Sequence, residues 1–297
     1  QPRRRAPGAG PKFAHDLRDR LLLALFWLRT YPTFELLGFF FALDKTSAED
    51  NLKDMLATLE SMTDFTLERP RKDRKNLHTV QEVLNAFPEL AVLIDAKEQR
   101  VQRPTDNVIG KAETGNVIGK AETGNVTGKN EAQKPYYSGK KKCHTLKNQV
   151  TVTPEGMIQA VSDSVPGGAN HDLTLLRDSH LLDQLQDDEA AMMDKGYVGI
   201  RNDYPNKRLY LPFKASRGHP LTEEQKAYNR HLSHYRIVIE HTMSQLNVFQ
   251  VLGQVYRHVR NGHTQVVRIV AGLVNRRIKR CPLKSYGASA QTAGMAA

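Results

Sequence analysis

The sequence contains little cysteine, and this shortage excludes two kinds of architecture. Its 297 residues include two cysteines, Cys143 and Cys281. They lie far apart, and neither belongs to a Cys-x-x-Cys pair or to a zinc-finger spacing with histidines. We therefore expect neither a disulfide framework nor a structural zinc site. Such cysteine usage favours a reducing, intracellular setting, which in a bacterium would be the cytoplasm or nucleoid.

Long apolar runs are also missing, which argues against a membrane protein. No window reaches the roughly 18 uninterrupted apolar residues that a spanning helix needs. The most apolar stretch, residues 21–42, is interrupted by Arg29, Pro32 and Glu35. No hydrophobic run with a small-residue cleavage site follows the basic start of the chain, so secretion is not expected. We expect a soluble globular protein. Because the sequence starts with Gln1 instead of Met, we interpret it as a fragment or a conceptual translation that lacks the true N-terminus.

Acidic residues are fewer than basic ones, and the resulting excess of positive charge favours a polyanionic partner. The chain has 43 Lys and Arg against 32 Asp and Glu, which gives a formal net charge of +11. Each nucleic-acid phosphate that a cation neutralises releases condensed counterions, so this balance favours nucleic-acid binding. Each basic cluster taken singly is better explained as a solvated surface. The clusters are residues 3–5, 69–75, 140–142 and 276–280.

Apolar residues at helical spacing predict a small α-helical domain at residues 14–65. The pattern runs to Leu28, restarts at Pro32, and resumes at residues 46–49, whose Thr-Ser-Ala-Glu order is that of a capping box. A tight connection at residues 42–45 favours a helix-turn-helix, whose last helix can lie in a DNA major groove. A plain helical bundle fits the same spacing equally well. The last predicted helix is locally acidic, with Glu49, Asp50 and Asp54.

The composition changes after this domain. Residues 66–88 are polar and mostly basic, which predicts a linker, and residues 89–281 alternate expected strands with helices, which predicts a second, α/β domain. Residues 107–133 of this domain hold a nine-residue repeat, interpreted as a loop insertion because lengthening a surface loop costs little closure entropy. Residues 282–297 are rich in small residues, and we expect them to be disordered.

Two short apolar runs of the second domain end in an aspartate. Residues 91–94 precede Asp95, and residues 190–193 precede Asp194. Each run suits a buried central strand that delivers a carboxylate at its end. If the two strands are neighbours in one sheet, their carboxylates lie side by side at its edge.

The other predicted elements surround these strands. Asn170 and Asp172 are expected to cap an amphipathic helix, and Glu240 lies on a long helix. In chain order we expect a hairpin from residues 144–153 and 157–165 with Pro-Glu-Gly at its turn, a helix to about residue 185, a strand at 209–211 and a long helix around 232–246.

Together these acids suit phosphodiester chemistry. That chemistry uses hard divalent cations held by oxygen ligands, so it needs several carboxylates on rigid elements. Asp95 and Asp194 at a sheet edge, with Glu240 from a helix across the sheet, would form such a set. Converging acids need metal or protons to offset their repulsion. A single aspartate after a strand is more often a cap or turn residue, and it is the joint pattern that favours a metal site.

Several blocks of sequence stand in a characteristic order. They are Ile94-Asp95, Val101-Gln102-Arg103-Pro104, residues 137–147, Gly168-Ala169-Asn170-His171-Asp172, Asp194-Lys195-Gly196-Tyr197 and Arg236-Ile237-Val238-Ile239-Glu240. In this order, over roughly residues 16–280, the chain resembles DDE transposases of the insertion-sequence and Harbinger-like kind. Its residues 19–59 resemble the helix-turn-helix that precedes the catalytic core in that family.

The resemblance implies a fold, an activity and a set of site residues. The fold is an α/β, ribonuclease H-like mixed sheet flanked by helices and preceded by a small all-α helix-turn-helix domain. The activity is Mg²⁺- or Mn²⁺-dependent cleavage and transfer of double-stranded DNA, with Asp95, Asp194 and Glu240 as catalytic, metal-binding residues. Asp172 competes with Asp194 for the second place, although its local context suits a helix cap. A homo-oligomer is the family-level expectation, since active transposases pair two DNA ends.

Five basic residues are candidates for DNA contact. Arg236 lies four residues before Glu240 on one helix face, where it can pair with that carboxylate or with a DNA phosphate. The others lie on or beside the second expected strand and would position a duplex without reading its sequence; a solvated basic edge fits them equally well. They are Lys140, Lys141, Lys142 and Lys147. The alternative function is a catalytically inactive, transposase-derived DNA-binding protein, and a stand-alone nuclease is a third possibility.

Overall fold

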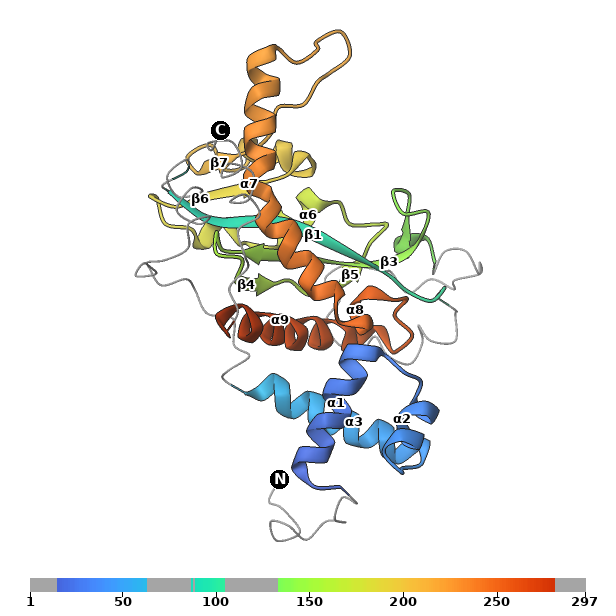
Figure 1. Ribbon diagram of the computed structural model, residues 1–297. Helices are drawn as coiled ribbons and strands as arrows, with labels where there is room; N and C mark the ends of the chain where they lie inside the picture. The colour runs from blue at the N-terminus through green and yellow to red at the C-terminus, as the bar shows by residue number, and fades with distance from the viewer. Residues whose placement is uncertain (1–14, 63–86, 88, 105–132, 281–297) are drawn as a thin grey trace, which may run out of the picture.

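A computed structural model describes residues 15–62, 87, 89–104 and 133–280 (Figure 1). Three predictions therefore lie outside the described residues: the linker at 66–88 except for Phe87, the repeat insertion at 107–133 except for Gln133, and the tail at 282–297. Among the helices that the structure describes, none is long and apolar enough to cross a membrane.

Three helices form the N-terminal part, as the sequence predicts. The N-cap of the third is Asp44, two residues before the predicted N-cap Thr46, and the Asp44 carboxylate accepts a hydrogen bond from the Ser47 amide at 2.9 Å. An aspartate in this position satisfies an amide of the first turn that has no partner within the helix. Thr46 therefore lies inside the helix. The three elements are α1 (Leu17–Thr30), α2 (Phe34–Phe40) and α3 (Lys45–Ser61).

These helices share one apolar core with the rest of the protein. The helix α1 packs against α8 (Gln250–Gly253), and α3 packs against α9 (His263–Arg280) (Figure 1). Trp27 of α1 is 2% exposed, and its ring centroid lies 5.0 Å from that of His258. Burying an aromatic side chain of this size against the second part of the chain fixes the N-terminal helices to the sheet domain.

The centre of the fold is a mixed sheet. Its middle strand, β1 (Leu90–Arg100), pairs antiparallel with β3 (Cys143–Val152) and parallel with β6 (Ala190–Met193). The path continues from β3 to antiparallel β4 (Ile158–Val161) and from β6 to parallel β7 (Arg208–Tyr210). The order β4-β3-β1-β6-β7 confirms the predicted ribonuclease H-like mixed sheet. Two short strands, β2 (Tyr137–Ser138) and β5 (Val165–Pro166), also pair with β3.

Helices cover both faces of this sheet. The long helix α7 (Glu223–Asn247) crosses one face together with α9, and α6 (Asp172–Ser179) lies on the other (Figure 1). Along β1 the side chains alternate between the two layers: Leu93 joins the core under α7 and α9, whereas Val92 and Ile94 join the core under α6. The 3-10 helices are η2 (Lys134–Tyr136), η3 (Leu182–Gln184), η4 (Lys195–Asn202) and η5 (Arg260–Gly262).

The predicted hairpin is confirmed, but β1 is longer than predicted. In the hairpin turn Gly156 has φ of 86°, and the Thr153 amide donates to the Met157 carbonyl. The strand β1 does not end at Asp95, because its antiparallel pairing with β3 continues to Arg100. Polar side chains in the second half of β1 form hydrogen bonds with the helical layer. The Gln99 side-chain amide, for example, donates to the Val251 and Gln254 carbonyls at 2.7 and 2.9 Å.

The helix α6 is shorter than predicted, and its N-cap residue is not one of the two predicted. It ends at Ser179, where His180 adopts a left-handed conformation with φ of 49°, instead of continuing to about residue 185. His171 occupies the N-cap position. The predicted capping roles of Asn170 and Asp172 are therefore wrong, since the Asn170 amide donates to the Pro166 carbonyl and the Asp172 carboxylate is directed to a lysine.

A buried histidine makes the stability of this fold dependent on pH. His263 is 1% exposed and lies between Ser164, 2.6 Å from its Nδ1, and Gln99, 2.8 Å from its Nε2. Burial lowers the pKa of His263 to about 3. Between about pH 6.5 and pH 3 the unfolded chain therefore binds a proton that the folded protein excludes.

The free energy of unfolding is consequently expected to fall as the pH falls below about 6.5, with His263 contributing a slope of up to about 1.4 kcal/mol per pH unit. Urea unfolding between pH 7 and pH 5 measures it. His263→Gln, which does not titrate, should show a shallower dependence than the unaltered protein. Identical slopes for the two proteins would contradict this assignment.

Candidate active site

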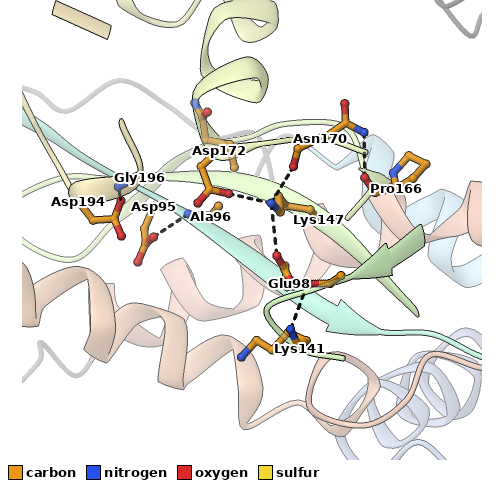
Figure 2. A network of polar contacts seen from close by, with 12 residues as sticks. Asp95, Ala96, Glu98, Lys141, Lys147, Pro166, Asn170, Asp172, Asp194 and Gly196 are labelled. Atoms are coloured by element: carbon orange, nitrogen blue, oxygen red, sulfur yellow. Dashed lines mark hydrogen bonds and ion pairs between the residues drawn. The ribbon is translucent and has the colours of Figure 1, made fainter. Parts of the chain in front are cut away.

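Asp95 and Asp194 lie next to each other where the parallel pairing of two central strands ends. In the register of β1 and β6, Ile94 is opposite Met193, and each is followed directly by an aspartate. The sequence-based expectation that the two strands are neighbours in one sheet is confirmed. Figure 2 shows the two side chains side by side at this edge.

Each of these aspartates is held by nearby donors. The Asp194 carboxylate accepts a hydrogen bond from the Gly196 amide at 2.7 Å and so caps η4. The Asp95 carboxylate accepts one from the Ala96 amide at 2.8 Å, and it forms an ion pair with Arg236 of α7 at 3.5 Å. Arg236 thus pairs with Asp95, and not with Glu240 as one reading of the sequence proposed.

The electrostatics of Asp95 show that the site gathers negative charge. Burial raises the pKa of the Asp95 carboxyl above its ordinary value. The Ala96 amide and Arg236 lower this pKa in part, whereas the charges of Asp194 and Asp172 raise it further. Neighbouring carboxylates that oppose ionisation in this way are a common feature of metal-binding and catalytic sites.

Asp172 is a third carboxylate at this edge. Its Oδ1 accepts a hydrogen bond from Lys147 at 2.8 Å. Its Oδ2 faces the space above Gly196, where a Cβ atom would lie 3.0 Å from this oxygen and 2.9 Å from Oδ1 of Asp194. Two carboxylates from different elements therefore border the same small space, which the glycine leaves open.

Tyr197 completes the cluster and was not singled out from the sequence, where it stood only as the last residue of the Asp-Lys-Gly-Tyr block. Its side chain is fully buried, and its hydroxyl has no hydrogen-bond partner among the described residues. Burial raises the pKa of Tyr197 well above its ordinary value, and the charges of Asp172, Asp95 and Asp194 raise it further. A buried hydroxyl without a partner among these residues, in the field of three carboxylates, calls for an explanation, and a bound water or ion would supply one.

Glu240 makes no contact with this cluster among the described residues. It is exposed on α7, and within the described chain no hydrogen bond or ion pair links its carboxylate to Asp95 or Asp194. Its position on the helix is nevertheless suitable. It lies one turn after Arg236 and two turns before Asn247, whose Oδ1 is 2.5 Å from Lys97 Nζ, so the strip of α7 that carries Glu240 faces β1 at both ends.

The five predicted DNA-contacting residues fall into different environments. Lys140, Lys141 and Lys142 are exposed in the turn between β2 and β3. Lys147, in contrast, is 5% exposed, and its ammonium contacts the Asp172 and Glu98 carboxylates. The prediction that Lys147 meets the DNA backbone is corrected, because the register of β1 and β3 places it opposite Glu98 inside the fold.

Two hollows adjoin the aspartates, and cations line both. A cleft of about 930 Å³ opens beside Asp95, and a smaller one of about 490 Å³ adjoins Asp194. Burial, together with a smaller effect of the Lys141 charge, lowers the pKa of Lys97, in the larger cleft, to about 8. The larger cleft also contains Arg100, Lys141 and Arg257, and the smaller one contains Lys195, Arg230 and Arg236.

The donors suit a hard divalent cation. All the converging groups are oxygens, and Mg²⁺ is commonly bound by one or two carboxylates with water completing its shell. In the described part of the chain no group of three or more acidic, histidine or cysteine side chains is arranged to hold a metal ion. The fit therefore rests on the adjacent Asp95 and Asp194, on the space over Gly196 and on the unpartnered hydroxyl of Tyr197.

The sequence matches a known enzyme family. Residues 122–275, more than half of the chain, match the family described as DDE superfamily endonuclease, and the chain belongs to this family. The predicted likeness to DDE transposases is thereby confirmed. The chain is an enzyme of the class that cleaves DNA phosphodiesters, and membership implies dependence on a divalent metal ion.

Individual relatives agree with this class. The chain is 26% identical over 273 residues to the probable transposase for insertion sequence element IS702 of Microchaete diplosiphon, covering 92% of this chain and 84% of that protein. Among solved structures it matches the Mos1 strand transfer complex (12% identity, 80% and 81% of the two chains, TM-score 0.23). It also matches the Mos1 transposase paired-end complex with left transposon end (11% identity, 93% and 80%, TM-score 0.22). Both TM-scores are too low to support a comparison of folds.

The open space at Gly196 gives a test of the site. Gly196→Ala places a methyl group against the Asp194 and Asp172 carboxylates, and displacing reacting groups by about 1 Å can cost roughly 10²-fold in rate. We expect DNA cleavage to fall by about that factor with little change in melting temperature. Gly262→Ala is the control, because its added Cβ would meet one atom at an ordinary 3.7 Å. Equal activity of the two variants would count against this geometry.

Proposed function

We propose that the chain is a DNA transposase that cleaves the ends of a mobile element and joins the resulting 3′ ends to target DNA, using Mg²⁺ or Mn²⁺. The observation that supports this most is the adjacency of Asp95 and Asp194 at the ends of paired parallel strands, in a chain of the DDE endonuclease family. The IS702 relative, itself described as a probable transposase, is matched over most of its length.

In this proposal Asp95 and Asp194 hold the metal from the sheet edge, and Glu240 contributes the third carboxylate from α7. Bound divalent ions supply activation of the attacking water or hydroxyl and stabilisation of the leaving oxygen. The position of Glu240 supports its role, because neighbours on the same strip of α7 contact Asp95 and Lys97. Asp172 competes with Asp194 for the second place, and its contacts are considered below.

Arg236 is proposed to serve both the acid and the DNA. Its guanidinium offsets the charge of Asp95 and also lines the smaller hollow, beside Asp194. Guanidinium groups bind phosphate oxygens through charge-assisted hydrogen bonds. A DNA phosphate that enters this hollow would therefore meet a cation directly next to the proposed metal ligands.

The exposed turn at residues 140–142 is proposed to contact the DNA backbone. Lys141 also lines the larger cleft, beside Asp95, so the turn lies at the entrance to the site. Each phosphate contact contributes roughly 0.9 to the slope of log affinity against log salt concentration. Contacts of this kind position a duplex without reading its sequence.

Replacing Lys140, Lys141 and Lys142 together with alanine is expected to weaken duplex binding at low salt and to reduce the salt slope by about 2 to 3. Fluorescence anisotropy at several salt concentrations measures both quantities. Lys53→Ala is the control, since that lysine already pairs with Glu49 at 2.8 Å on another surface. A triple variant with the affinity and slope of the unaltered protein would show that the turn is only a solvated edge.

DNA binding by a helix-turn-helix at residues 14–65 is less well supported than DNA contact by the turn at residues 140–142. The exposed side of α3 carries Asp50 and Asp54, the latter paired with Arg20, and its other side packs against α9. An acidic surface repels phosphates. We therefore place the DNA backbone on the sheet-edge side of the protein. A homo-oligomer is proposed because joining two element ends to a target needs the ends to be paired.

Cleavage of duplex DNA tests the proposed function against its rival. We expect nicking of a duplex that carries the element's own ends, in the presence of Mg²⁺ or Mn²⁺, followed by appearance of joined product when a second duplex is added. A DNA-binding protein without turnover would bind the same duplex and leave it intact under every metal condition. Nicking without joined product would favour a stand-alone nuclease.

A further inference from the structure

Lys147 is a buried lysine whose contacts lead into the candidate site. Its Nζ lies 2.8 Å from Oδ1 of Asp172 and 3.3 Å from Oε1 of Glu98, and it donates to the Asn170 carbonyl at 2.8 Å (Figure 2). An ammonium group has three donors. Each of them is therefore accounted for by an acceptor inside the protein.

Such a group is expensive to bury, so its position calls for a reason. Buried ion pairs seldom stabilise a fold more than well-packed apolar residues of the same volume would. Removing one partner, however, leaves the other charges uncompensated. A stability role alone thus explains Lys147 poorly, whereas holding a particular carboxylate in a particular place explains it well.

The two oxygens of Asp172 have different surroundings. Oδ1 is bound by Lys147, and Oδ2 faces the space over Gly196 that Oδ1 of Asp194 also borders. The ammonium therefore fixes the carboxylate through one oxygen and leaves the other directed at the site. The unpartnered, fully buried hydroxyl of Tyr197 lies in the field of the same carboxylates.

Glu98 secures Lys147 from the opposite side. Its second carboxylate oxygen accepts a hydrogen bond from the Ser138 hydroxyl at 2.9 Å, and the Ser138 hydroxyl oxygen accepts one from the Lys141 amide at 3.3 Å. Figure 2 shows this chain running from the basic turn to Asp172. The ammonium of Lys147 is thus held between strands and cannot follow Asp172 if that side chain turns away.

We propose that Lys147 is a positioning residue that holds Asp172 as an additional metal-binding carboxylate on the Asp194 side of the site. This inference rests on the proposed function, because it requires a divalent ion at Asp95 and Asp194. It assigns to Asp172 a role beside the catalytic carboxylates, and to Lys147 a role exerted entirely through Asp172.

Binding of Mn²⁺ to the DNA-free protein, followed by the electron paramagnetic resonance signal of free Mn²⁺, tests the proposal. Asp172→Asn and Lys147→Met are each expected to weaken Mn²⁺ binding by roughly 10- to 100-fold, as loss of supporting contacts does at other metal sites. The double variant should bind no more weakly than Asp172→Asn alone, because Lys147 acts through that residue.

Arg177→Met is the matched control. Arg177 pairs with Asp203 at 2.8 Å and so joins α6 to the η4 segment, the elements that begin at or next to Asp172 and Asp194. Its loss should leave Mn²⁺ affinity unchanged. If Lys147→Met does not fold, as a thermal melt would show, Lys147→Gln takes its place, because it keeps a polar donor and loses the charge, and Mn²⁺ binding should again weaken. Asp172→Asn separately tests the ligand role of Asp172, since a lost ligand must weaken the binding.

The outcomes separate the inference from the function on which it rests. Unchanged Mn²⁺ affinity in Asp172→Asn or in folded Lys147→Met, together with weakened binding in Asp95→Asn, would overturn the inference and leave the proposed function standing. Additive losses in the double variant would also overturn it. An unaltered protein that binds no Mn²⁺ would overturn both.

Discussion

Asp95→Asn is expected to abolish metal-dependent DNA cleavage while leaving the protein folded. A carboxylate that holds an ion acting as a Lewis acid accounts for several kcal/mol of transition-state stabilisation, which corresponds to a rate loss of roughly 10³-fold. The measurement is initial nicking rate on end-bearing duplex DNA at saturating Mg²⁺, and Asp194→Asn should behave in the same way.

The melting temperature provides the internal control for this variant. Burial and the neighbouring acids raise the pKa of Asp95, so its ionised form is less favourable in the folded protein than in the unfolded chain at neutral pH. Removing the charge should therefore leave the stability unchanged or slightly higher. Cleavage at the unaltered rate in a folded Asp95→Asn protein would rule out Asp95 as a metal ligand.

Glu240→Gln is the second substitution with a large expected effect. If Glu240 supplies the third carboxylate, cleavage should fall by roughly 10²- to 10³-fold. The side chain is exposed, so stability should hardly change. Glu224→Gln, an exposed acid in the first turn of the same helix, is the matched control and should cleave normally.

Comparison with Asp172→Asn also distinguishes Glu240 from Asp172, the carboxylate that the sequence weighed against Asp194 for the second place. Full activity in Glu240→Gln, with strong loss in Asp172→Asn, would transfer the third position to the carboxylate that Lys147 holds. Loss in both variants would place four carboxylates in the working site. In either case the nicking rate and Mn²⁺ affinity of the same proteins should change together.

The sequence predicts the frame of the site because local patterns determine it. Residues 91–94 and 190–193 are apolar runs too short for helices, and each ends in an aspartate, so two buried strands with acids beyond their ends follow from sequence alone. The strand β7 and the helix α7 follow from similar patterns. The pairing of β1 with β6, which brings Asp95 and Asp194 together, depends on tertiary structure, and it was expected from the resemblance to DDE transposases.

The remaining features depend on partners distant in sequence. Asp172 stands where a helix cap is expected, and only the β1–β3 register, which places Lys147 opposite Glu98, shows why its carboxylate turns elsewhere. For the same reason Lys147 looked like one more surface lysine in a basic stretch. Tyr197 carried no signal beyond its place in a block, because an unpartnered hydroxyl is visible only once its surroundings are known.

The most direct test of the central claim is the position of a metal ion. Crystals of the protein soaked in Mn²⁺ should give an anomalous peak at the edge shared by β1 and β6, within about 2.0 to 2.6 Å of carboxylate oxygens of both Asp95 and Asp194. A peak bound elsewhere, or none at this edge at saturating Mn²⁺, would contradict the account.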